Sequence, residues 1–145
     1  MTPASPSLRA FAVRLIAHEA KLNKVAAVKS TVVFVIPDKL RPHLSTFMGK
    51  AGFRALVGRA LALAAAEVPW LVSLKVQPDG SLHPPAELMA QVSPSERLEG
   101  RVVLLAQLLG LMVAFVGEKL TLRLVHEVWP TLSTQELHFG KGTKK

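Results

Sequence analysis

The sequence predicts a mainly α-helical fold, and two observations carry this prediction. Leu, Ala and Val supply most of the apolar residues, whereas aromatic residues make up 6% of the chain and tyrosine is absent. Several segments also repeat apolar residues at intervals of three and four, the period of a helix with one buried face. We therefore expect a compact bundle of about five helices with a small β-hairpin near residues 71–83.

The length of the chain bounds its domain organisation. At 145 residues, it has the size of one ordinary domain that can bury its own core. We expect a single helical domain over residues 1–145, with flexible ends at 1–6 and 140–145. No internal repeat is evident along the chain.

Two segments have clear helical patterns. Residues 7–23 follow a Ser-Pro-Ser sequence and place apolar side chains on one stripe, which predicts a capped helix. His18 interrupts that stripe, and a satisfied core or boundary histidine explains it better than a ligand does. Residues 50–67 lie between Gly49 and Pro69 and predict the cleanest amphipathic helix of the chain.

Residues 31–48 allow two readings. The β-branched run 31–36 has the composition of a strand. However, Leu40, Leu44 and Phe47 continue an apolar stripe at helical spacing beyond Pro37. We therefore prefer one helix from about residue 30 that is kinked at Pro37 and ends at Gly49.

The second half predicts a hairpin and further helices. Alternating apolar residues after Trp70, followed by a Pro-Asp-Gly turn at residues 78–80, predict the hairpin. A short helix should run from residue 84 to about 92. Ser93 and Glu96 have the spacing of a capping box, which predicts the start of a long final helix. Trp70 and Trp129 each adjoin a proline at an element end, where a core-capping role is favoured.

The most apolar stretch runs from residue 102 to 116, and Gln107 is its one polar side chain. Fifteen helical residues span about 22 Å, which is short of the roughly 30 Å hydrocarbon core of a bilayer. We therefore expect a helix enclosed by protein rather than a membrane span. Too few other helices are predicted to enclose it easily, so a second subunit is the simplest cover; a monomer whose own helices suffice is the alternative.

Small residues along this helix suggest where a partner helix could approach, because they allow close packing. Glu118 lies in line with the apolar surface and, if buried, would need a cationic partner such as Arg54, Arg59 or Arg101. The predicted interface consists of Ala106, Gln107, Gly110, Gly117 and Glu118.

The excess of positive charge lies in the first part of the chain. The formal net charge is +8, and residues 1–60 hold ten Lys or Arg against Glu19 and Asp38. Such asymmetry can mark a surface for nucleic acid, although it also fits a solvated face that keeps the protein soluble. The predicted anion contacts are Lys21, Lys24, Lys29, Lys39, Arg41, Lys50 and Arg54.

No catalytic, cofactor-binding or metal-binding motif is found in the sequence. There is no cysteine, the five histidines lack metal-ligand spacing, and no glycine-rich phosphate loop is present. An enzyme with a dispersed site remains an alternative, with Glu118, His43 or His126 as acid or base.

These observations favour a non-enzymatic helical interaction or assembly protein, either an oligomer or a regulatory subunit. The expected partner is a second copy or another protein. The alternative function is binding to the backbone of a nucleic acid, as a basic protein or a small subunit of a nucleoprotein complex. A cytoplasmic location is expected, because the N-terminal apolar stretch is too short for a secretory signal and cysteine is absent.

Overall fold

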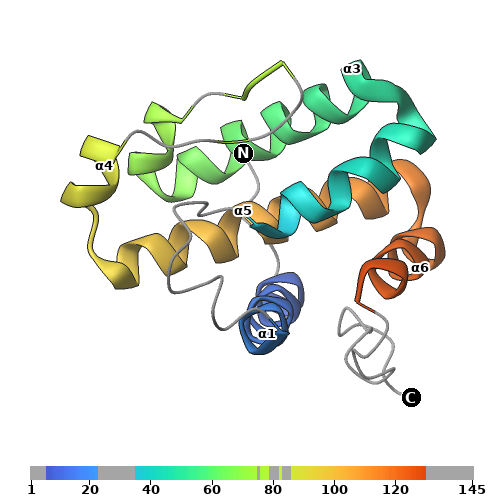
Figure 1. Ribbon diagram of the computed structural model, residues 1–145, viewed down its shortest axis with the longest axis horizontal. Coiled ribbons are helices and arrows are strands. Elements are labelled where there is room, and N and C mark those ends of the chain that lie inside the picture. Colours follow the sequence, from blue (N-terminus) through green and yellow to red (C-terminus); the bar gives the residue numbers. More distant parts are fainter. Residues whose placement is uncertain (1–5, 23–34, 75, 79–81, 83–85, 130–145) are drawn as a thin grey trace.

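The computed structural model in Figure 1 describes residues 6–22, 35–74, 76–78, 82 and 86–129. These residues are mainly helical, which confirms the predicted class. The elements are α1 (Pro6–Leu22), α3 (Val35–Glu67), the 3-10 helix η1 (Pro69–Ser73), α4 (Ala86–Gln91), α5 (Pro94–Val116) and α6 (Glu118–Val128).

The predicted hairpin is wrong for the described residues. Pro69 begins η1 instead, and the pairing that follows is one isolated antiparallel bridge between Val76 and Leu82. Leu71 and Leu74 are buried while Val72 is exposed, so burial repeats every three residues, as in a 3-10 helix, and not every two. The predicted count of five helices is not borne out either. Among the described residues the long helices are α1, α3, α5 and α6, and α4 has only six residues.

The break in α3 lies at Gly49 and not at Pro37. The helix begins at Val35, so Pro37 falls in the first turn, where the missing amide hydrogen costs nothing. Gly49 has φ 83° and ψ 160° inside the helix, a region of backbone conformation that is essentially restricted to glycine. Residues 31–34, on which the choice between strand and helix partly depended, lie outside the described residues.

The start of α5 confirms the predicted capping box. Ser93 Oγ accepts a hydrogen bond from the Glu96 amide at 3.2 Å, and the Ser93 amide donates to Glu96 Oε1 at 2.9 Å. The predicted long final helix is divided at Gly117, which has φ 92° and ψ 158°. The Gly117 carbonyl then accepts the first hydrogen bond of α6, from the amide of Thr121 at 3.1 Å. This division separates the apolar α5 from the amphipathic α6.

Helix α5 lies at the centre of the core. In Figure 1 it crosses the middle of the view, with α3 above it and α1 below it. Every residue from Val103 to Leu109 is buried, as is Met112. The helix is therefore enclosed over this region by elements of its own chain.

Both tryptophans pack on this core. Trp129, at the C-cap of α6, is fully buried, which confirms its predicted core-capping role. Trp70 is partly buried in η1, and its indole Nε1 donates to the Glu96 carbonyl at 3.2 Å. Gly100 is buried against the Trp70 ring.

The unusual backbone conformation of Gly49 and Gly117 predicts that substituting either residue lowers the stability of the fold. Replacing either glycine with alanine should reduce the free energy of unfolding by about 1–3 kcal/mol, because a Cβ disfavours this conformation. The effects should be nearly equal, since the two sites have the same geometry and open space around them. Gly58→Ala is the matched control within α3. It should be neutral or stabilising by up to about 1 kcal/mol.

Urea unfolding would measure all three free energies. Equal effects at Gly49, Gly117 and Gly58 would contradict the assignment of a special backbone role to the first two.

Candidate interaction surface

Three of the five predicted interface residues are used within the chain. Ala106 is fully buried and Gln107 is 8% exposed. A Cβ added to Gly110 would lie 3.2 Å from Leu8 Cδ1 of α1. The small side chains thus allow α1 to approach α5, and this part of the stripe is covered without a second subunit.

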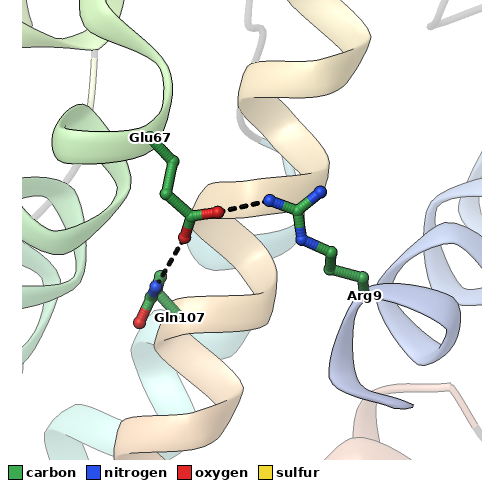
Figure 2. A network of polar contacts seen from close by, with 3 residues as sticks. All are labelled: Arg9, Glu67 and Gln107. Atoms are coloured by element: carbon green, nitrogen blue, oxygen red, sulfur yellow. Dashed lines mark hydrogen bonds and ion pairs between the residues drawn. The ribbon is translucent and has the colours of Figure 1, made fainter. Parts of the chain in front are cut away.

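A polar network joins α1, α3 and α5 (Figure 2). Glu67, the last residue of α3, accepts a hydrogen bond from Gln107 Nε2 at 2.8 Å on one carboxylate oxygen and forms an ion pair with Arg9 through the other. The Glu67 side chain is 15% exposed and that of Arg9 is 39% exposed. A carboxylate buried to this degree needs such partners. The network therefore has a structural role, and of the two carboxylates Glu67 and Glu118 it is Glu67 that is largely buried, whereas Glu118 is exposed.

The remaining two predicted residues, Gly117 and Glu118, are exposed. They lie where α5 turns into α6, and the break of α3 lies near this turn, because Phe47 and Met48 line one groove together with Phe115 and Val116. We call the two turns together, residues 46–51 and 114–119, the corner surface. Lys50, Glu118 and Lys119 are exposed charged residues on it.

An apolar groove connects the two turns. Its volume is about 440 Å³. Two phenylalanines flank it: Phe47 is 54% exposed and Phe115 is 65% exposed. The lining residues are Phe47, Met48, Gly52, Ala55, Leu56, Arg59, Phe115 and Val116.

The exposure of Phe47 departs from the sequence prediction. Leu40 and Leu44 on the same stripe are buried, as expected. Phe47 comes two residues before the break at Gly49, at the end of the helix, and the neighbouring Gly52 and Ala55 leave space beside it. Phe115 stands in the same position before Gly117. The sequence feature that could have predicted this surface is the Phe-x-Gly pattern that occurs at both turns.

Two of the predicted anion contacts lie together. Lys50 and Arg54 are exposed on α3 and line a hollow of about 570 Å³ that also involves Val76 and Pro78. Arg54 Nε donates to the Gln77 carbonyl at 3.3 Å. Lys39 and Arg41 are only partly exposed in the first half of α3. Lys21 belongs to α1, but its side chain lies outside what the structure describes. Lys24 and Lys29 lie outside the described residues altogether.

The candidate acid–base residues do not converge on a common site. His43 Nδ1 lies 3.5 Å from Glu127 Oε1 on α6, with both side chains well exposed. His126 is exposed on α6, and Glu118 is exposed at the start of the same helix. Within the described residues no group of three His, Asp or Glu side chains is arranged to hold a metal ion.

Comparison of the chain with protein-family models, curated proteins and solved structures gives no match. Among the described helices, α5 alone is long and apolar enough to cross a membrane. Half of its most apolar window is buried by the rest of the chain, and core helices of soluble proteins meet the same criterion. One such helix is weak support for a membrane span.

Proposed function

We propose that this protein is a non-enzymatic assembly protein that associates with a second copy of itself through the corner surface. The observation that carries the proposal is the pair of exposed phenylalanines, Phe47 and Phe115, beside one apolar groove. Single exposed apolar residues are ordinary on protein surfaces, but clustered ones mark interaction sites. Val13, Val72 and Leu98 are also exposed, but they do not line the groove.

A second copy suits this surface for two reasons. The corner surface presents projecting aromatic side chains next to a groove, so it offers both halves of a self-complementary contact, as a two-fold interface requires. It also carries both signs of charge, with Lys50 on one turn and Glu118 on the other. Two copies can therefore meet with opposite charges paired.

The test is the oligomeric state in solution. Sedimentation velocity from low micromolar to submillimolar protein should show a reversible, concentration-dependent dimer. The double variant Phe47→Ser/Phe115→Ser should weaken association by at least about tenfold, because exposed aromatic anchors dominate such contacts. Val72→Ser removes a side chain that is 72% exposed elsewhere and should leave the dimer unchanged. A wild-type chain that stays monomeric throughout would overturn the proposal.

The second candidate function is binding to a nucleic-acid backbone. The observation that favours it is the position of Lys50 and Arg54 on one hollow of about 570 Å³. Two cations one helical turn apart can neutralise adjacent phosphates without reading bases.

Titration of labelled duplex DNA at increasing salt would test this second candidate. The logarithm of affinity should fall with log salt at a slope of about −0.9 per phosphate engaged. Arg54→Glu should weaken DNA binding evenly across sequences while leaving self-association intact, because Arg54 lies outside the corner surface. No binding at low salt, or a flat salt dependence, would leave the positive charge with a role in solubility alone.

A further inference from the structure

Two stretches of the chain have the same pattern around their glycine breaks. Residues 40–61 form a first unit and residues 108–129 a second, aligned at one constant offset. Each unit contains a helix, a Phe-x-Gly turn and a second helix. The two glycines share nearly the same φ and ψ, at 83° and 160° against 92° and 158°. Identical pairs are Leu40 and Leu108, Phe47 and Phe115, Gly49 and Gly117, Leu56 and Leu124, and Val57 and Val125.

Burial follows the same alignment. The leucine and valine pairs are buried in both units, the phenylalanines are exposed in both, and most other positions agree as well. Phe53 in the first unit and Thr121 in the second are both buried, although their chemistry differs. Corresponding residues therefore occupy corresponding environments. The expectation of no internal repeat was wrong because few of the corresponding residues are identical.

The packing between the units is reciprocal. The second half of α3 packs on α5, where Ala55 and Leu56 line the same groove as Val116. In return, α6 packs on the first half of α3, where His43 lies near Glu127. Each unit's second helix thus contacts the other unit's first helix. This is the relation that a two-fold axis produces, in which a contact from one side is repeated from the other.

Exposed charges distinguish the units. Lys50 in the first corresponds to Glu118 in the second, and Arg59 corresponds to Glu127. All four side chains are exposed. Lys50 and Glu118 each follow the glycine of their own turn, so they occupy equivalent places on the corner surface with opposite sign. Lys119 adds a further positive charge, at a position where the first unit has Ala51.

We infer that the chain contains two related helix–glycine–helix units, and that a second copy docks on the corner surface with its Glu118 opposite Lys50. The inference rests on the proposed self-association and specifies its register. In a two-fold contact the pairing occurs twice, with Lys50 of each copy facing Glu118 of the other. The other register would place Lys50 against Lys50 and Glu118 against Glu118, which repel.

Charge reversal tests this register. Lys50→Glu alone and Glu118→Lys alone should each weaken self-association about tenfold, because each makes both contacts repulsive. Mixing the two single variants should restore association to within about threefold of wild type, because both contacts in the mixed dimer then join opposite charges. If Lys50 instead paired with Glu118 of its own chain, mixing the two variants would not restore association. Arg14→Glu and Glu99→Lys are the matched controls: they make the same changes of charge at exposed positions outside the corner surface and should not alter association.

Sedimentation equilibrium of each variant and of the mixture, with circular dichroism to confirm folding, separates the outcomes. A wild-type dimer whose single variants dissociate and whose mixture reassociates supports the inference. A wild-type dimer that is insensitive to both reversals keeps the proposed self-association but overturns the register. A wild-type monomer overturns both.

Discussion

Replacing Trp129 with alanine is expected to reduce the free energy of unfolding by about 4 kcal/mol, the largest effect of any substitution considered. The side chain is fully buried and is the largest in the core to be so. Its removal takes away the apolar contacts of the indole and leaves a cavity that the surrounding helices can only partly close. Trp129 also closes the end of α6, where its amide donates to the Val125 carbonyl at 2.8 Å.

Thermal and urea unfolding of the Trp129→Ala protein would measure this effect. A loss of this size should lower the melting temperature by roughly 10 °C or more for a domain of this length. Trp129→Phe retains much of the apolar volume and should lose less than half as much stability. Val72→Ala is the exposed control and should stay within about 0.5 kcal/mol of wild type. A Trp129→Ala loss no larger than that of the control would contradict the placement of this side chain in the core.

The helical class could be predicted because its signals are local. The apolar period of residues 50–67 and the capping box of Ser93 and Glu96 depend on neighbours in the sequence alone. The hairpin prediction failed because the segment after Trp70 has apolar residues at intervals of both two and three. Only packing decides between them, and it buries Leu71 and Leu74. The kink was assigned to Pro37 because proline disrupts a helix interior, but there it lies in a first turn.

The candidate surface was harder to predict because it depends on how the elements meet. The stripe that includes Ala106 and Gly110 correctly indicated close helix packing, but no sequence signal identifies α1 as the helix that covers Gly110. Gly117 and Glu118 were selected from the same stripe, and they do lie on the exposed end. Phe47 was grouped with core residues, since helical spacing alone cannot show that α3 breaks at Gly49. Its exposure depends on that break.

Replacing Arg9 with methionine should also be destabilising, by about 2 kcal/mol, a value between those of exposed and buried ion pairs. Methionine keeps most of the aliphatic length, so the chief loss is the cation beside Glu67. That carboxylate is 15% exposed and also accepts a hydrogen bond from Gln107. Removing a cation that is paired with a largely buried carboxylate is costly. The expected loss lies below the range for fully buried pairs because the Arg9 side chain is 39% exposed and water screens its charge.

The double variant Arg9→Met/Glu67→Gln separates the charge from the packing. Glutamine is uncharged and retains a carbonyl oxygen that can accept from Gln107, so removing both charges should recover most of the stability lost in Arg9→Met. Urea unfolding of both single variants and the double variant gives the coupling energy directly. Arg14→Met, at an exposed arginine of the same helix, should change stability by less than about 0.5 kcal/mol. If Arg9→Met behaves like Arg14→Met, the ion pair does not hold α1 against the end of α3. If the double variant is no more stable than Arg9→Met, the loss comes from packing of the arginine stem rather than from the charge of Glu67.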